Sequence, residues 1–320
     1  MARYRTRLPQ LSTKLFLTDA GMETCLIFHE GIALPFFASF DLLKDEEGAA
    51  RVRRYYARYI ALARRHGLGF VLESPTWRAN PEWAAKLGYG SGALAAINRR
   101  AIALMAELRA AHETAHSPIV ISGNIGPRDD GYSPARMMRA SEACDFHAEQ
   151  INVFRDTDAD LVSAFTLNYV DEAIGIVRAA AAAEMPVVIS FTVETDGKLP
   201  TGQSLRDAIL QTDATAGQPP VYYMLNCAHP THFAAVLQPD EPWVQRLRGV
   251  RANASTRSHA ELDAAPDLDA GDPVALARQY RALRQRLPQL TILGGCCGTD
   301  HRHVEQICLA CTAADDRAVA

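Results

Sequence analysis

The sequence lacks the features of membrane, secreted and nucleic-acid-binding chains. No apolar run reaches the roughly 20 residues of a membrane span, and no signal-type apolar core follows the basic start. Arg3, Arg5 and Arg7 suit a transit peptide, but we expect a solvated arm before the first strand. The formal net charge is −4, from 33 basic and 37 acidic residues, so no general basic excess indicates nucleic acid. We expect neither a membrane nor a nucleic-acid partner.

Disulfide cross-links are also not expected, although the chain holds seven cysteines. Seven is an odd number, and Cys296 and Cys297 are adjacent, which disfavours a bridge between these two. A reducing cytoplasm, with thiols kept for packing or metal binding, is the better interpretation.

Short β-rich runs alternate with longer amphipathic segments along the chain, and no low-complexity linker separates two halves. The expected strands lie at residues 15–19, 69–74, 118–124, 159–165, 186–192, 221–227, 248–254 and 290–296. The expected helices lie at residues 53–67, 91–116, 135–156, 170–184, 204–214, 231–237, 273–287 and 300–311.

Eight strand–helix units predict an α/β protein, a single (β/α)8 TIM barrel over residues 1–320 with its core at about 12–312. The strands are apolar enough to be covered on both faces, as parallel strands are. A short N-terminal arm and a C-terminal tail flank the core, and residues 258–272 are expected as a loop. A doubly wound sheet is the alternative, but no GxGxxG follows the first strand.

Three cysteines fall at the ends of predicted strands. Cys227 ends the sixth strand, and Cys296 and Cys297 end the eighth within Gly-Gly-Cys-Cys-Gly-Thr. In a barrel these ends share one mouth, so three thiolates can bind Zn²⁺ and leave a fourth position for substrate. Gly294 and Gly295 are expected to release the backbone from strand geometry so that both adjacent thiols face inward. At an open mouth such thiols can also oxidise and release the metal.

The remaining cysteines and the histidines near Cys227 are expected to have structural rather than catalytic roles. Cys25, Cys144, Cys308 and Cys311 are expected to be packing residues. His229 and His232 follow Cys227 and are rival metal ligands, but a capping or solvent-facing role is the better expectation.

The motifs Asn226-Cys227-Ala228-His229-Pro230 and GGCCGT at residues 294–299 resemble the homocysteine S-methyltransferase family. Further matches follow in order over about residues 12–312: Asp19-Ala20-Gly21-Met22, Glu73-Ser74-Pro75-Thr76-Trp77, Gly123-Asn124-Ile125-Gly126-Pro127, Ser190-Phe191-Thr192 with Asp196-Gly197, and Ala252-Asn253-Ala254. The resemblance implies a (β/α)8 barrel and a zinc ion on Cys227, Cys296 and Cys297 that activates a thiol. It also implies substrate contacts from Asp19, Gly21, Glu73, Thr76, Arg78, Phe165, Asn226 and Asn253.

One position departs from the family pattern. After strand four the family shows Phe-Glu-Thr, with a glutamate that helps to hold the substrate amino group, whereas this chain reads Ala164-Phe165-Thr166. Phe165 cannot pair with an ammonium ion as a carboxylate does, so Asp19 and Glu73 are the candidates to share it. We expect weak homocysteine binding, improved by F165E.

Two features near the second strand concern the substrates. Arg78 stands where betaine-type relatives carry an aromatic residue, and it can bind a carboxylate bidentately or face water. Trp77, Trp83, Tyr132 and Phe165 can form a cage for a cationic methyl donor, although packing is the more common role of such aromatics.

The resemblance thus predicts a zinc-dependent transferase that moves a methyl group from a small cationic donor, such as S-methylmethionine or S-adenosylmethionine, to a thiol. We expect no second barrel or cobalamin module in the same polypeptide, which favours a small-molecule donor. Homocysteine, giving methionine, is the expected acceptor; another thiol or selenol, or a separate corrinoid protein as donor, is the alternative. A non-catalytic zinc module and a barrel enzyme of unrelated chemistry stay open, as does a homo-oligomer.

Overall fold

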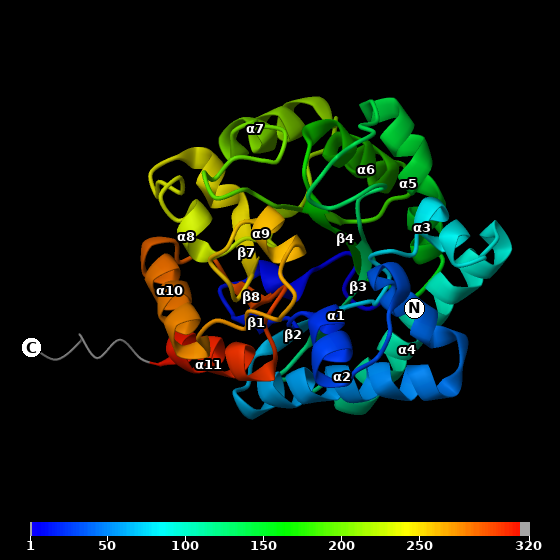
Figure 1. The fold of residues 1–320 in the computed structure, drawn as a ribbon, viewed down its shortest axis with the longest axis horizontal. Helices are drawn as coiled ribbons and strands as arrows, with labels where there is room; N and C mark the ends of the chain where they lie inside the picture. The colour runs from blue at the N-terminus through cyan, green and yellow to red at the C-terminus, as the bar shows by residue number, and fades with distance from the viewer. Residues whose placement is uncertain (1, 314–320) are drawn as a thin grey trace, which may run out of the picture.

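The computed structural model describes residues 2–313, and within them eight parallel strands close into one barrel in sequence order (Figure 1). The strands are β1 (Phe16–Leu17), β2 (Gly69–Glu73), β3 (Ile119–Ile125), β4 (Leu161–Leu167), β5 (Val187–Phe191), β6 (Tyr222–Asn226), β7 (Leu247–Ala252) and β8 (Ile292–Gly295). Strand β1 pairs with β2 on one side and with β8 on the other, which closes the ring. The expected TIM barrel is confirmed, and the doubly wound alternative is wrong.

Helices surround the barrel. They are α1 (Met22–Thr24), α2 (Glu46–Arg65), α3 (Pro81–Lys86), α4 (Ser91–His112), α5 (Ala140–Arg155), α6 (Val170–Ala182), α7 (Leu205–Thr215), α8 (Pro230–Phe233), α9 (His259–Asp263), α10 (Pro273–Arg286) and α11 (His301–Thr312). Short 3-10 or π segments lie at Pro9–Leu11, Cys25–His29, Pro35–Phe37, Ser39–Lys44 and Pro242–Arg246. No helix among residues 2–313 is long and apolar enough to cross a membrane.

Three helix boundaries differ from the sequence expectation. Helix α2 begins at Glu46 rather than at residue 53, because the Asp45 side chain accepts a hydrogen bond from the Gly48 backbone and caps the first turn. Helix α5 begins at Ala140 rather than at residue 135, so the loop that carries Tyr132 is longer. The expected loop at 258–272 contains α9, which Ser258 caps in a capping box with Glu261.

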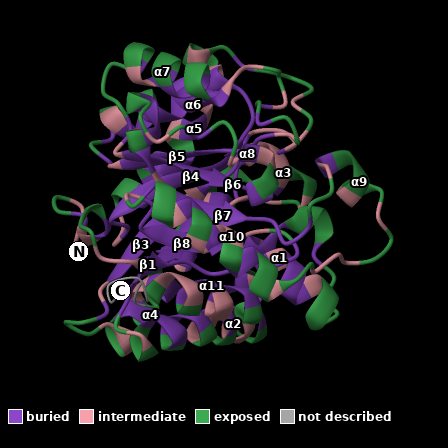
Figure 2. Cartoon of the chain, turned by 90° about the vertical axis from the view of Figure 1, so that its left-hand side faces the viewer, coloured by how far each residue is buried: buried purple, intermediate pink, exposed green. Residues whose placement is uncertain are grey.

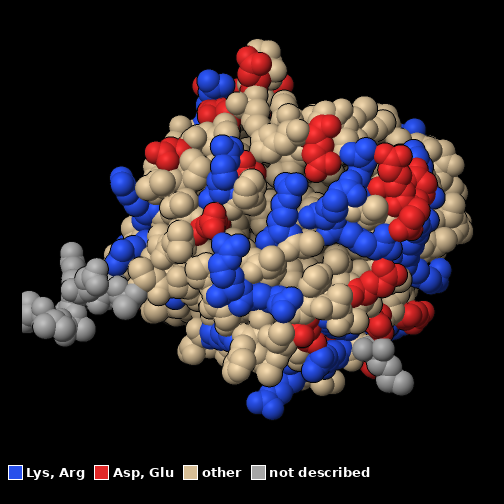
Figure 3. Space-filling model, turned by 90° about the horizontal axis from the view of Figure 1, so that it is seen from below, with Lys and Arg blue, Asp and Glu red and all other residues tan. Residues whose placement is uncertain are grey.

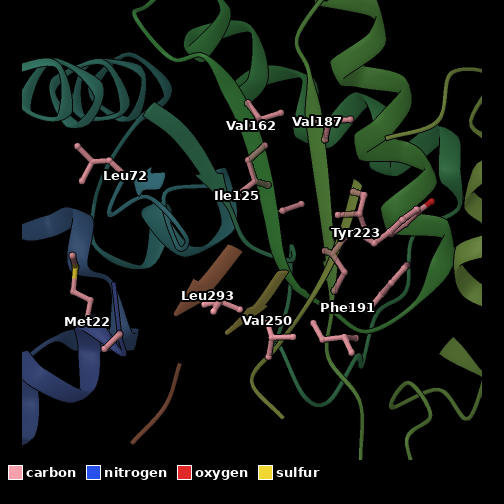
Figure 4. Packing of buried hydrophobic residues seen from close by; sticks show 14 of the residues in the cluster. Met22, Leu72, Ile125, Val162, Val187, Phe191, Tyr223, Val250 and Leu293 are labelled. Atoms are coloured by element: carbon pink, nitrogen blue, oxygen red, sulfur yellow. The ribbon is translucent and has the colours of Figure 1, made fainter. Parts of the chain in front are cut away.

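Successive side chains of each strand point to opposite faces, so the barrel has two apolar clusters, one outside the strands and one inside them. The larger cluster lies between the strands and the helices, and Figure 4 shows Val162, Val250 and Leu293 in this layer. There the rings of Phe191 and Tyr223 stack with their centroids 6.1 Å apart. The smaller cluster fills the barrel interior, and Figure 2 shows the strands buried within a shell of half-exposed helices.

The barrel interior changes character along its axis. Its lower part is apolar and includes Val71 of β2, Leu161 of β4 and Met224 of β6. Two residues further along their strands, Glu73 and Ser163 are also buried, and the period of two places them on the same inner face. The carboxyl ends of the strands therefore enclose a polar floor.

The N-terminal arm is only partly solvated, because Leu8 is buried while Arg3, Thr6 and Arg7 are exposed, so the expectation of a solvated arm is wrong in part. The backbone N–H groups of Arg3 and Tyr4 both donate to Oδ1 of Asp160 at 2.7 Å. The Arg5 guanidinium donates to the carbonyls of residues 155, 157 and 159, and Leu8 belongs to the interior cluster. In Figure 2 the arm lies at the end of the barrel opposite to α1 and α9. The arm closes the amino end, where an open barrel would expose apolar side chains. The expected C-terminal tail lies almost wholly outside the described residues.

Charges of both signs are interspersed on the face of the molecule drawn in Figure 3. Along α2, Arg53 pairs with Glu46 at 2.5 Å and with Glu107 at 3.0 Å, and Arg51 pairs with Glu47 at 2.8 Å. This face carries no field of a single sign.

Candidate active site

A cavity of about 140 Å³ opens at the carboxyl ends of the strands. Most of the residues predicted from the sequence line it, namely Asp19, Gly21, Glu73, Phe165, Asn226, Cys227, Cys296 and Cys297. The other three predicted contacts, Thr76, Arg78 and Asn253, are buried but do not line it. In a TIM barrel this end is where catalytic residues gather.

The three cysteines converge at this mouth. Their sulfur atoms all lie within 4.8 Å of one another, and the sulfurs of Cys227 and Cys297 are 4.0 Å apart. Among residues 2–313 they form the one cluster able to supply three metal-binding side chains. The prediction that two distant strand ends bring these thiols together is confirmed.

The structure joins Cys227 and Cys296 in a disulfide, whereas the sequence analysis expects free thiols. Their Cα atoms are 5.5 Å apart, which is the usual separation for a bridge. Sulfurs that converge closely enough to share a metal are also close enough to oxidise to a bridge. Cys297 stays free and exposed to the cavity.

The backbone of Cys227 is held in an unusual conformation. Its φ is +55°, a left-handed value that non-glycine residues seldom adopt. Its carbonyl accepts hydrogen bonds from Asn253 Nδ2 at 2.9 Å and from His259 Nε2 at 2.5 Å. Asn253, expected to touch substrate, therefore fixes the turn that aims the Cys227 sulfur into the cavity.

Gly294 and Gly295, which precede the adjacent cysteines, have no room for a side chain, and their φ angles are not positive. A Cβ atom at Gly294 would lie 1.9 Å from Oγ1 of Thr18, and one at Gly295 would lie 2.1 Å from Oγ1 of Thr299. Neither glycine has a positive φ, so the expected release from strand geometry is wrong here. Gly298 does have a positive φ of 79°, in the turn before α11.

The cysteine geometry fits Zn²⁺. Three thiolates about 2.3 Å from a tetrahedral ion would hold their sulfurs about 3.8 Å apart, close to the 4.0 Å between Cys227 and Cys297. The joined sulfurs of Cys227 and Cys296 would have to separate to about this distance, so the fit is that of the reduced cluster. Soft thiolate ligands favour zinc over magnesium or calcium. The fourth tetrahedral position would face the cavity rather than a protein ligand.

The loop before α5 and the short helix α9 meet over the thiols. The Tyr132 ring stacks on the His259 ring with centroids 3.9 Å apart, and its hydroxyl lies 3.5 Å from the Cys297 sulfur. Nδ1 of His259 lies 3.0 Å from Oε1 of Glu194. Glu194 and His259 thereby hold the phenol ring against the thiol cluster.

Asn226 supports the opposite wall. Its Oδ1 accepts from the Thr166 backbone at 2.9 Å and from Ser190 Oγ at 2.7 Å, and its Nδ2 donates to Thr166 Oγ1 at 2.8 Å. Thr166 has φ +63°, a rare value for a β-branched residue, and its hydroxyl lies 3.8 Å from the Cys227 sulfur. The strained turns at Thr166 and Cys227 therefore brace each other.

Ionisable groups form the floor of the cavity. Asp19 and Arg251 make an ion pair of 2.9 Å between Oδ1 and Nη2, with little of either side chain exposed. Asp19 Oδ2 accepts from the Tyr55 hydroxyl at 2.9 Å. Burial raises the pKa of Glu73 to about 7 although Arg251 opposes the shift, and among the described residues its Oε2 has no hydrogen-bond partner.

Arg78 was predicted from the sequence to contact substrate, but it does not line the cavity. Its guanidinium lies between the rings of Trp77 and Trp83, 4.2 Å and 3.8 Å from their centroids, and donates to the Asp129 carbonyl at 3.0 Å. The aromatic cage, which the sequence left as the alternative to packing, is incomplete: Trp77, Tyr132 and Phe165 line the cavity, whereas Trp83 packs on Arg78 and does not. Thr76 bonds the Asn124 carbonyl at 2.7 Å and is likewise a structural residue.

The other cysteines and histidines behave as expected. Cys25 and Cys308 are buried among apolar side chains. His229 caps α8 by accepting from the Thr231 backbone, and His232 lies 2.9 Å from the Thr256 carbonyl. Neither histidine belongs to the metal-binding cluster.

The fold and site define a class of enzyme: a (β/α)8 barrel with a thiol cluster at the mouth of a buried, charged cavity. The sequence profile of homocysteine S-methyltransferases matches residues 16–311. The chain therefore belongs to the homocysteine S-methyltransferase family and is a methyltransferase.

The fold is also that of solved structures. The homocysteine methyltransferase MmuM from Escherichia coli, in its oxidised form, is 20% identical, with a TM-score of 0.74 over 95% of this chain and 99% of that one. Its metallated form gives 19% identity and a TM-score of 0.69 over 95% of this chain and 99% of that one. Its apo form gives 19% and 0.66 over 96% and 100%. A search of curated protein sequences returns no significant match.

Sequence reasoning missed Arg251, His259 and Glu194. Arg251 carried a usable signal, because an arginine inside an apolar strand of a closed barrel has to be paired when it is buried. His259 and Glu194 carried none, since loops that are distant in the sequence bring them to Cys227.

Proposed function

We propose that this protein transfers a methyl group from a small cationic donor to homocysteine, with Zn²⁺ held by Cys227, Cys296 and Cys297. The observation that carries the proposal is the convergence of three sulfurs at the mouth of a charged cavity in a member of this family. Three protein ligands with a fourth position towards the cavity suit a catalytic zinc site, since structural sites are closed by four.

Bound at these cysteines, zinc would supply thiol activation, by keeping the acceptor sulfur deprotonated at neutral pH. The protein itself binds and orients the two reactants. The new carbon–sulfur bond forms as the bond from the methyl group to the cationic donor breaks, and the donor leaves neutral. In-line placement of donor and acceptor is the main contribution that the cavity walls make.

Glu73 is the side chain best placed to hold the ammonium group of homocysteine. Asp19 is already held by an ion pair with Arg251 and by the Tyr55 hydroxyl, whereas Oε2 of Glu73 has neither a hydrogen bond nor an ion pair among the described residues. A buried carboxylate oxygen without a partner is costly unless a ligand supplies a donor. Glu73 thus takes over the task that Phe165 cannot perform.

The donor would enter along the aromatic side of the cavity. Phe28, Phe37, Trp77 and Tyr132 line it, and Phe28 and Phe37 are about half exposed. A sulfonium such as S-methylmethionine is attracted to ring faces as other cations are. Trp77 and Tyr132 are shared with the cage that the sequence left as an alternative to packing.

Methyl transfer by the reduced, zinc-loaded protein tests the proposal. Homocysteine would be combined in turn with S-methylmethionine, S-adenosylmethionine and methylcobalamin, and methionine would be measured. We expect methionine from a sulfonium donor, its loss in C297S and its retention in C308S. Methionine from methylcobalamin alone would point to a corrinoid donor, and no methionine from any donor would refute the proposed function.

A further inference from the structure

Arg251 is an unusual residue to find inside a barrel. Its side chain is about 10% exposed and projects inward from β7. Its Nε donates to the Gly295 carbonyl at 3.1 Å, and its Nη2 donates to the Ala20 carbonyl at 3.1 Å while pairing with Asp19. The guanidinium thus links the ends of β1, β7 and β8. Its contact on β8, Gly295, directly precedes Cys296, one of the three proposed zinc ligands.

One nitrogen of this guanidinium is unused. No hydrogen bond within residues 2–313 involves Nη1 of Arg251, and the ion pair with Asp19 runs at its closest through Nη2, although the residue lines the cavity. A guanidinium carries five N–H donors in a rigid fork, and buried ones are normally occupied. The two N–H groups of Nη1 are therefore available to a ligand in the cavity.

Phe165 leaves Nη1 of Arg251 without a carboxylate partner on this side of the cavity. The Arg251 guanidinium carbon lies 5.2 Å from the centroid of the Phe165 ring, where the family pattern places a glutamate. A carboxylate at that position would pair with Arg251 at close range, whereas a ring face supports the cation without using its N–H donors. The departure from the family pattern and the free donors of Arg251 thus belong to one arrangement.

We propose that Arg251 is a specificity-determining residue that binds the carboxylate of the acceptor thiol through Nη1. The inference rests on the proposed function and adds the substrate group that the enzyme reads. The acceptor sulfur lies at the cysteines and its carboxylate at the guanidinium beside them, across one cavity. The favoured acceptors are thiols that carry a carboxylate a few bonds from the sulfur, and aminothiols without one are rejected.

Three thiols separate the contributions. Homocysteine carries both groups, 4-mercaptobutanoate lacks the amino group, and 3-aminopropane-1-thiol lacks the carboxylate. Calorimetry on the reduced, zinc-loaded protein measures the binding of each thiol without any methyl donor. We expect the two carboxylates to bind at least roughly 30-fold more tightly than the aminothiol, as charge-assisted bonds to a guanidinium predict.

The variant R251Q should remove this preference. Binding of homocysteine and of 4-mercaptobutanoate should weaken by roughly 30-fold, while binding of the aminothiol should be little changed. Comparing two thiols on one variant cancels any general loss of site structure. R248Q is the matched control, since Arg248 lies on the same strand at the far end of the barrel and bonds the Leu11 carbonyl.

Equal binding of all three thiols by the wild type would overturn the inference, whether or not R251Q folds. An unchanged carboxylate preference in R251Q would also overturn it and would assign the carboxylate to another group. Failure of methyl transfer despite selective carboxylate binding would instead refute the proposed function alone.

Discussion

Single side chains in the cavity floor hold charge where solvation is poor. The Asp19–Arg251 pair at 2.9 Å is buried, and Glu73 lies on the same inner surface. Removing one member of a buried ion pair typically costs about 3–5 kcal/mol, because the other charge is left uncompensated. The desolvation of both charges offsets much of their attraction, so such a pair contributes little net stability.

The pH dependence of stability can measure the free-energy cost of burying the charged Glu73 carboxylate. Its carboxyl has a pKa of about 7 in the native state and an ordinary value of 4.5, because burial penalises the charged form. The native state therefore holds this proton more tightly, so the stability that Glu73 contributes is present below pH 4.5 and is lost as pH rises through 7. We expect E73Q to gain up to about 3 kcal/mol in free energy of unfolding relative to wild type between pH 5 and pH 8.

Urea unfolding at several pH values gives this difference. E149Q is the control, because Glu149 is exposed and its variant should track the wild type at every pH. A constant offset between E73Q and wild type would show that Glu73 is ionised throughout this pH range.

Phe165 gives a second prediction, and the structure reverses the one made from the sequence. A glutamate introduced there would meet the Arg251 guanidinium, 5.2 Å from the present ring centroid, before any ammonium group. We expect F165E to lower kcat/KM for homocysteine roughly tenfold below that of F165Q, the neutral variant of equal shape. Improved use of homocysteine by F165E would show that the carboxylate reaches the substrate and that Arg251 does not hold it.

Which residues the sequence reveals depends on how local their role is. The cysteines were predictable because strand ends in a barrel share one mouth and a Gly-Gly-Cys-Cys run has few other uses. Arg78 was misplaced because its contacts, Trp83 and the Asp129 carbonyl, come from other segments. Arg251 was missed although it is a charged residue in an apolar strand; its partners, the carbonyls of Ala20 and Gly295, lie just after β1 and at the end of β8.

At the scale of elements, the arm at the amino end is part of the fold. Arg5 makes four hydrogen bonds to three carbonyls after α5, and Leu8 plugs the barrel interior. Asp160 joins the arm to the barrel, because it accepts from two arm N–H groups and pairs with Arg109 at 2.7 Å. The arm therefore stabilises the end of the barrel away from the cavity.

Truncating Arg5 tests this role. We expect R5A to lower the free energy of unfolding by about 1.5–3 kcal/mol, since its bonds to carbonyls are charge-assisted. R7A is the matched control: Arg7 is exposed, no hydrogen bond of its side chain is found in the described chain, and its loss should change stability by less than about 0.5 kcal/mol. Equal, small effects of R5A and R7A would mean that the arm does not contribute.

Element types were predictable from the sequence, whereas their ends were not. All eight strands follow from apolar runs between turn signals, because each is buried on both faces. The start of α2 was missed although Asp45 and two glutamates marked it. Helix α9 was missed because five residues are too few for a periodic pattern to appear.

At the scale of the whole molecule, the two ends of the barrel have different roles: the amino end stabilises the fold, and the carboxyl end carries the candidate active site. The amino end is closed by the arm and an apolar interior, while the carboxyl end holds the strained turns, the buried charges and the thiols. The same division applies to TIM-barrel enzymes in general. The fold is shared with MmuM although only 20% of the residues are identical.

The metal content of the purified, reduced protein tests the central claim most directly. The account predicts close to one equivalent of zinc in the wild type and in C308S, and loss of most of it when Cys227, Cys296 or Cys297 is replaced by serine. Oxidation should release the metal, because the Cys227–Cys296 bridge removes two thiolates at once. Full retention of zinc in C297S would contradict the account.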